Sequence, residues 1–135
     1  MKENRVIEHI VNWLKDYKNN SSLDGFIIGI SGGIDSALAS TLVAKTQLPV
    51  LCLEMPIYQD KDQIQRGKDH IKWLKKKFQN VTSLETDLTN VFKLFQEETL
   101  LKQNNTLALA NARSRLRMMN IYYYAQIHNY LVVGT

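Results

Sequence analysis

Cysteine, proline and long apolar runs are scarce in this chain of 135 residues. It has one cysteine and two prolines, which excludes a framework of internal disulfides. Cys52 lies in the apolar run PVLCLEM and is expected to be a buried structural thiol. The sequence lacks an apolar stretch long enough to cross a bilayer, and its first residues, MKENRVIEHIVNWLKDY, are amphipathic rather than signal-like. We therefore expect a cytoplasmic protein that does not engage a membrane.

Charge and histidine spacing limit the class of ligand. The 17 Lys and Arg residues outnumber the 13 Asp and Glu residues, which gives a formal net charge of +4. That excess suits a small anionic ligand, but it is too small and too scattered to indicate a nucleic-acid partner. The three histidines stand far apart, without the spacing of metal ligands.

Short apolar runs alternate with helical patterns along the chain. Strands are predicted at 26–30, 49–55, about 80–85 and 130–135. Helices are predicted from the first residues to the turn-rich KNNSSLDG segment, and then over 36–46, 60–78, 89–98 and 106–128. Because strands separated by helices require crossover connections, the pattern predicts an α/β fold, a doubly wound parallel sheet with helices on both faces.

The length of the chain fits one domain over residues 1–135. Its last predicted strand ends at Thr135, and covering helices normally follow a central parallel strand. We therefore expect these residues to be the amino-terminal portion of a longer domain.

The segment GISGGIDSALAS, residues 29–40, joins the first predicted strand to the next helix. Ligands of open α/β sheets bind at this kind of junction, where N–H groups of the first helical turn point outward. Gly32 and Gly33 can adopt positive φ and have no Cβ to block an oxyanion, while Ser31 and Ser36 add hydroxyl donors. An ordinary turn, with Asp35 or Ser36 as the helix N-cap, is the alternative. The flanking strand and helix favour a phosphate site.

Asp35 is unexpected in a plain phosphate loop, because a carboxylate repels phosphate oxygens unless a cation lies between them. The sequence therefore predicts that Asp35 binds Mg²⁺ that bridges to the phosphates. Two better-known phosphate motifs, G-x-x-x-x-G-K-[ST] and G-x-G-x-x-G, do not match this segment.

The hexapeptide SGGIDS, residues 31–36, resembles the SGGxDS signature of the PP-loop ATP pyrophosphatases. That resemblance implies cleavage of ATP between its α and β phosphates, with adenylylation of an oxygen on an acceptor. It does not identify the acceptor.

The helix predicted around 107–126 carries three arginines at alternate positions. Asn111 and Arg115 are four residues apart and share a helix face with a methionine and a tyrosine. Arg113 and Arg117 fall roughly on the opposite face, since two residues turn a helix by about 200°. We therefore expect Arg115 to be partly buried and to need an anionic partner. The spacing leaves open whether that partner is an internal carboxylate or a ligand.

The combination of GISGGIDSA, an N-x-x-x-R-x-R-M helix and a strand ending in Gly-Thr is similar to the bacterial ammonia-dependent NAD synthetases. The resemblance implies deamido-NAD binding at Arg115 and Asn111, Mg²⁺ at Asp35, and a further ATP contact at Thr135. It implies that ATP phosphates lie along Gly29, Ile30, Ser31, Gly32, Gly33, Ile34, Asp35 and Ser36. A fourth strand placed beside the first would also bring Thr135 to this loop.

The match has gaps. The family continues beyond Gly-Thr with an acidic residue that binds Mg²⁺ and with further phosphate contacts, which this sequence does not contain. The segment 55–63 lies where the family contacts adenine, but its match is loose, and we expect Gln59 to be a solvated loop residue.

The reaction that the resemblance implies is the ATP-dependent amidation of deamido-NAD to NAD with ammonia. An acyl adenylate would form, with release of pyrophosphate and then AMP. No residue in the sequence is a convincing nucleophile or general base, so catalysis would rest on positioning and electrostatics. Tyr122, Tyr123 and Tyr124 spread around the helix and cannot all be buried in one contact. Because members of the family form homodimers, we expect a homodimer.

Two alternatives remain at this stage. One is another PP-loop adenylylating enzyme, such as a tRNA-modifying enzyme. The other is an ATP-binding module without turnover.

Overall fold

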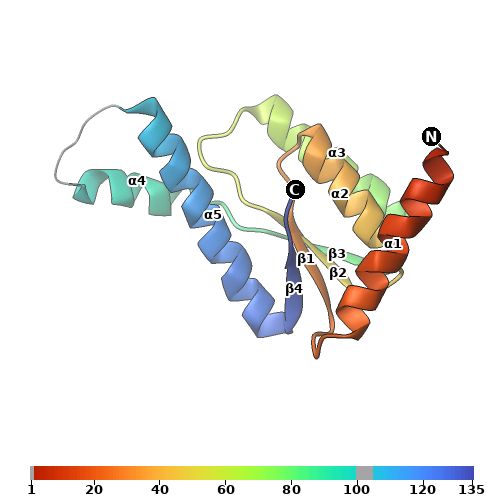
Figure 1. The fold of residues 1–135 in the computed structure, drawn as a ribbon. Coiled ribbons are helices and arrows are strands. Elements are labelled where there is room, and N and C mark those ends of the chain that lie inside the picture. Colours follow the sequence, from red (N-terminus) through yellow and green to blue (C-terminus); the bar gives the residue numbers. More distant parts are fainter. Residues whose placement is uncertain (1, 100–104) are drawn as a thin grey trace.

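A parallel four-stranded sheet forms the centre of the computed structural model, which describes residues 2–99 and 105–135. The spatial order of the strands is β3-β2-β1-β4, and each neighbouring pair is parallel. Their bounds are β1 (Gly25–Gly29), β2 (Val50–Glu54), β3 (Val81–Glu85) and β4 (Tyr130–Val133). The α/β class and the doubly wound parallel sheet are confirmed (Figure 1).

Helices cover both faces of the sheet. One face packs against α1 (Glu3–Asn19), α2 (Ile34–Ala44) and α3 (Lys61–Lys77). The other face packs against α4 (Thr89–Glu98) and α5 (Thr106–His128). Where both bounds of an element were predicted, the observed bounds lie within two residues of them. None of the helices in the described ranges is long and apolar enough to cross a membrane.

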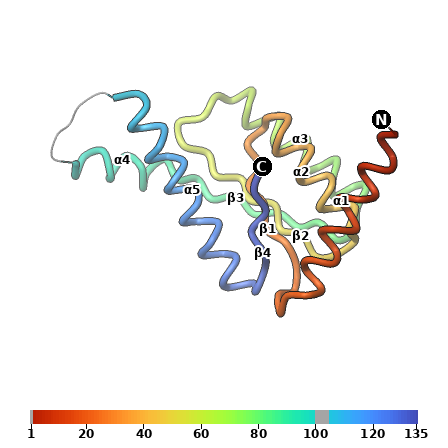
Figure 2. Tube along the Cα trace, in the orientation of Figure 1, coloured from red at the N-terminus to blue at the C-terminus, as the bar shows by residue number. Residues whose placement is uncertain are grey.

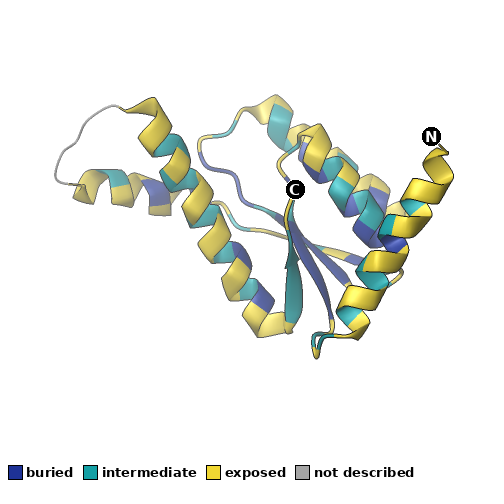
Figure 3. Cartoon of the chain, in the orientation of Figure 1, coloured by how far each residue is buried: buried dark blue, intermediate teal, exposed yellow. Residues whose placement is uncertain are grey.

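The two central strands are the most deeply buried elements, as Figure 3 shows. Because side chains alternate along a strand, Phe26 and Ile28 of β1 enter the core beneath α1, α2 and α3, while Ile27 enters the core beneath α5. At the edge of the sheet, β4 is half-buried throughout. The two continuous apolar runs, which predicted strands buried on both faces of the sheet, are therefore β1 and β2.

Strand β4 lies beside β1, as in the common order of doubly wound sheets, and Val133 is in register with Ile28. The turn before β4 uses Asn129, which has φ 61 and ψ 46, a left-handed conformation that asparagine tolerates. The backbone N–H of Asp24 donates to the Asn129 carbonyl oxygen at 2.8 Å, joining the starts of the two strands. The C-terminus consequently lies at the end of the sheet where β1 leads into α2 (Figures 1 and 2).

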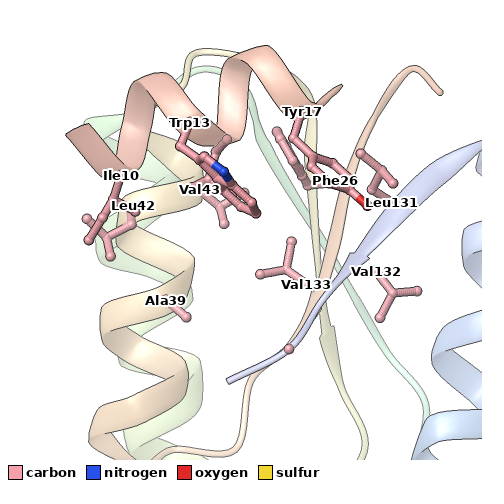
Figure 4. A pocket seen from close by; sticks show the side chains of 12 residues that line it. Ile10, Trp13, Tyr17, Phe26, Ala39, Leu42, Val43, Leu131, Val132 and Val133 are labelled. Carbon is pink, nitrogen blue, oxygen red and sulfur yellow. The ribbon is translucent and has the colours of Figure 1, made fainter. Parts of the chain in front are cut away.

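An apolar hollow of about 480 Å³ lies between α1, α2 and β4 (Figure 4). Its walls include Trp13 and Tyr17 of α1 and Leu131 and Val133 of β4. None of the residues that line it is charged, and most are apolar, so this hollow does not suit an anion and does not explain the phosphate motif.

Candidate functional site

Residues 30–33 connect β1 to α2, and two serines hold the loop closed. The Ser31 backbone N–H donates to the Ser36 hydroxyl oxygen at 3.1 Å, and the two hydroxyl oxygens are 3.0 Å apart. The Gly33 N–H donates to the Ser31 hydroxyl oxygen at 3.2 Å, and the Ser36 hydroxyl donates to the Gly33 carbonyl at 3.2 Å. These bonds hold the loop in shape before any ligand binds.

The N-cap of α2 is Gly33. The alternative in which Asp35 or Ser36 caps this helix is therefore wrong. Among the described residues no side chain caps α2, so N–H groups of its first turn remain free to bind an anion. The electrostatic field at this helix end also favours negative charge.

The two glycines of the loop differ in conformation. Gly32 has φ +87, and a Cβ built on it would lie within 3.0 Å of the Gln63 backbone carbonyl oxygen. Gly33 has φ −90 and ψ 169, which any residue can adopt. Of the two glycines that can adopt positive φ, only Gly32 does so, and only Gly32 is pressed against α3.

Asp35 lies in the first turn of α2 and its side chain is exposed. Within residues 2–99 and 105–135, no group of three or more His, Cys, Asp or Glu side chains gathers as a preformed metal site. A metal ion at Asp35 would therefore have one carboxylate from the chain and would need further oxygen ligands, such as phosphate oxygens of a bound ligand.

Two glutamines also hold the loop. The side-chain amides of Gln59 and Gln63 each donate to the Ser31 carbonyl oxygen at 3.0 Å. The expectation that Gln59 is a solvated loop residue is therefore wrong, since it is half-buried and bonded to the loop. A contact across 28 residues leaves no signal in the local sequence, apart from the position of Gln59 after a buried strand.

A hollow of about 340 Å³ lies directly beside the loop. Its walls include Gly29 at the end of β1, Ile30 and Ser31 of the loop, Gln59 from the segment after β2, and Gln63 of α3. Thr135 also lines it, because β4 lies beside β1 and ends at the same edge of the sheet.

Helix α5 presents a different arginine to this hollow than the sequence suggested. Asn111 and Arg115 are exposed, so the expected partial burial of Arg115 is wrong. Arg113 and Arg117 are half-buried instead. The expectation treated the methionine and tyrosine near Arg115 as core residues, but Met118 and Tyr122 are 39% and 56% exposed.

The face of α5 that packs on the sheet carries Leu116, Ile121 and Ala125. Arg117 precedes Ile121 by four residues and therefore lies next to that buried face. Leu109, Arg113, Arg117 and Ile121 follow one another at intervals of four residues and so lie along one side of α5. This spacing was the feature of the sequence that could have predicted the partial burial of Arg117. Its Nε donates to the Met55 carbonyl oxygen at 2.9 Å.

The three consecutive tyrosines divide as their spacing requires. Tyr124 packs against the core, whereas Tyr122 and Tyr123 are exposed. Cys52 is fully buried, and burial raises the pKa of its thiol to about 12, so its expected structural role is consistent with the fold.

The sequence profile of one protein family, NAD synthase, matches residues 6–135. The NH(3)-dependent NAD(+) synthetase of Malacoplasma penetrans is 36% identical over 132 residues, which are 97% of this chain and 51% of that protein. The enzyme of the same name from Sulfolobus acidocaldarius is 37% identical over 131 residues, covering 96% of this chain and 46% of that protein. The chain thus spans about half the length of these curated relatives.

Solved structures agree with these matches. NMN synthetase from Francisella tularensis superposes with a TM-score of 0.90 and 34% identity, covering 100% of this chain and 55% of that one. The NH3-dependent NAD synthetase of Campylobacter jejuni gives 0.88 and 27% identity, covering 100% and 57%. With a family match over nearly every residue and the same arrangement of strands, helices and loop, the chain belongs to the NAD synthase family.

Proposed function

We propose that this chain is the ATP-binding part of an ammonia-dependent NAD synthetase. The observation that carries the proposal is the loop between β1 and α2, where Gly32 is left-handed and the first turn of α2 has N–H groups free for an anion. The hollow beside it is large enough to admit part of a nucleotide. We assign ATP phosphates to residues 29–36 and a further ATP contact to Thr135.

The residues of the loop fit a magnesium ion. Mg²⁺ is commonly bound in nucleotide sites by one or two carboxylates together with phosphate oxygens and water. The exposed carboxylate of Asp35 at the helix N-terminus meets that requirement once phosphates are bound. The ion would neutralise the negative charge that develops on the departing pyrophosphate.

The proposed chemistry is activation of a carboxylate followed by amide formation. A carboxylate oxygen of deamido-NAD attacks the α-phosphorus of ATP, the bond to the β-phosphate oxygen breaks, and pyrophosphate leaves. Ammonia then attacks the acyl carbon, the bond from that carbon to the adenylate oxygen breaks, and AMP leaves; the nitrogen loses one proton to water, giving the carboxamide. The role of the chain is to hold the phosphates with N–H groups and to align the reactants.

The exposed face of α5 suits a substrate that binds between two copies of the protein. Asn111 and Arg115 lie on this face, and we assign them to deamido-NAD. Tyr122 and Tyr123, 56% and 63% exposed, add apolar surface beside them. Aromatic surface of this kind is enriched at protein interfaces, which supports a homodimer. We place this homodimer in the cytoplasm, where the sequence leads us to expect the protein.

The chain itself can be tested by calorimetric titration with ATP in the presence and absence of Mg²⁺. We expect binding that Mg²⁺ strengthens, and we expect Asp35→Asn to lose that strengthening while its melting temperature stays close to that of the wild type. Asp16→Asn, an exposed change on α1, removes the same charge away from the loop and is the matched control. A folded chain that binds no ATP would refute the proposal.

A turnover assay distinguishes two possible acceptors, deamido-NAD and the carboxylate precursor of NMN. The chain is incubated with ATP, Mg²⁺, ammonium and either deamido-NAD or the carboxylate precursor of NMN, and AMP and amide products are measured. AMP formed with deamido-NAD supports an NAD synthetase. AMP formed only with the mononucleotide would assign the chain to the activity for which the Francisella tularensis relative is named. ATP binding without AMP from either acceptor would mean that these residues bind nucleotide but do not complete the reaction.

A further inference from the structure

Arg117 is a half-buried cation that the proposed function leaves without a role. Burial lowers the pKa of its guanidinium, and the neighbouring charge of Arg113 lowers it further. The ion pairs found within the described ranges are those of Lys68 with Glu54 and with Glu85, so none of them neutralises Arg117. A partly desolvated cation that forms no ion pair is costly unless an anion from outside the chain compensates it.

The guanidinium stands where two hollows meet. One is the 340 Å³ hollow beside the phosphate loop, which Gly29, Ser31 and Thr135 help to line. The second is a hollow of about 410 Å³ lined by residues that include Tyr58, Asp60 and Arg113. Arg117, Gln59 and Gln63 are the residues common to both linings.

Its hydrogen bonding leaves donors available. The Nε–H is used on the Met55 carbonyl oxygen, at 2.9 Å, directly after β2. That bond fixes the plane of the guanidinium, and the Nη groups retain N–H donors. A planar fork of N–H donors matches two oxygens of a phosphoryl group.

The loop forms the opposite wall of the first hollow through Ile30 and Ser31. The first turn of α2, which follows this loop, has free N–H groups that suit the pyrophosphate end of a triphosphate, beside Asp35. Arg117 approaches from α5, a different element on the other face of the sheet. A group held between the two walls is the phosphoryl group that joins the pyrophosphate to the nucleoside.

We propose that Arg117 binds the α-phosphoryl group of the bound nucleotide, across the hollow from the phosphate loop. This inference rests on the proposed ATP site, which it deepens. The group stays on the substrate side after pyrophosphate leaves, so Arg117 would hold the adenylate while ammonia attacks. The residue would therefore contact both ATP and AMP, but not free pyrophosphate.

The test is an NMR titration of the 135-residue chain and of Arg117→Gln with AMP, pyrophosphate and adenosine. For Arg117→Gln we expect AMP binding to weaken about 10- to 100-fold, the range for loss of a charge-assisted pair of hydrogen bonds. Binding of pyrophosphate and of adenosine should change by less than about threefold. Arg5→Gln, an exposed change on α1, removes the same charge elsewhere and should bind all three ligands like the wild type.

Arg117→Lys keeps the charge but not the fork, and its AMP affinity should fall between those of the wild type and Arg117→Gln. If Arg117→Gln does not fold, Arg117→Lys tests the inference instead, and we expect it to lose more affinity for AMP than for adenosine. Equal losses for AMP and adenosine would mean that Arg117 only anchors Met55, and would overturn the inference. Unchanged AMP binding in a variant that still binds ATP would also overturn the inference about Arg117, but it would leave the proposed function intact. A wild-type chain that binds neither ATP nor AMP would refute both the inference and the proposed function.

Discussion

Replacing Gly32 with alanine should cost both stability and nucleotide binding, whereas the same change at Gly33 should cost binding alone. The two residues are adjacent in one loop, and each change adds one methyl group. They differ in backbone conformation and in what the methyl group would meet. The pair therefore separates strain in the fold from obstruction of the ligand.

At Gly32 two costs combine. Its φ of +87 is a conformation that alanine adopts at a cost of about 1–3 kcal/mol. Its new Cβ would also lie within 3.0 Å of the Gln63 carbonyl oxygen, a backbone atom in α3 that cannot rotate away. Moving α3 to relieve the clash adds about 1–3 kcal/mol, as in other overpacked sites. A total of several kcal/mol in a chain of this size lowers the melting temperature by about 10 °C or more.

At Gly33 the backbone is extended, and a Cβ would have its nearest contact, the Ser31 hydroxyl oxygen, at 3.4 Å. The melting temperature should therefore change by no more than about 3 °C, corresponding to a change under about 1 kcal/mol. The methyl group stands at the N-cap of α2, where we place a phosphate, so ATP affinity should fall by about tenfold or more.

Thermal unfolding followed by circular dichroism and ATP titration of the folded variants provide the two readouts. Equal melting temperatures for Gly32→Ala and Gly33→Ala would refute the account of Gly32. Undiminished ATP affinity in Gly33→Ala would refute the placement of the phosphate.

Two further predictions concern titratable groups, the buried thiol of Cys52 and the half-buried imidazole of His70. Burial raises the pKa of the Cys52 thiol to about 12. At pH 8 the native chain should therefore react with iodoacetamide about a thousandfold more slowly than the urea-unfolded chain, as followed by mass spectrometry. Equal rates would contradict the burial of Cys52. His70 Nε2 lies 2.8 Å from the Ser40 hydroxyl oxygen, and burial lowers the pKa of this histidine. The contribution of neutral His70 to the stability of the fold should therefore be complete above the unfolded pKa of about 6.5. It should be lost as pH falls through the lower pKa of the folded state. NMR titration should give a His70 pKa below about 6.5. The urea midpoint should fall less between pH 7.5 and 5.5 in His70→Asn than in the wild type. A His70 pKa at or above the free value would show that the folded state does not disfavour the charged imidazole.

Local patterns were sufficient for most of the fold. The apolar runs of β1 and β2 are readable because strands buried on both faces need apolar residues at every position. The position of the SGGIDS loop follows directly from such a strand and the helix after it. Even the neighbouring placement of β4 and β1 follows from the common order of doubly wound sheets, and with it the position of Thr135.

The orientation of α5 could not be deduced in the same way. Its apolar residues are spread around the helix, so spacing alone offered more than one buried face. The choice depended on contacts with Ile27, Leu51 and Leu53, which belong to strands far away in the sequence. Those contacts turned Arg115 outward and Arg117 toward the loop.

The sequence by itself determined the class of fold, the position of the SGGIDS loop and the family, because each can be recognised from short stretches of local sequence. Tertiary structure decided which residues surround that loop. Gly32 must be glycine because α3 brings the Gln63 carbonyl against it, and Gln59 and Gln63 bond to Ser31 across 28 and 32 residues. Contacts of this kind arise only when the helices pack on the sheet, since no local pattern specifies which distant backbone atom will approach.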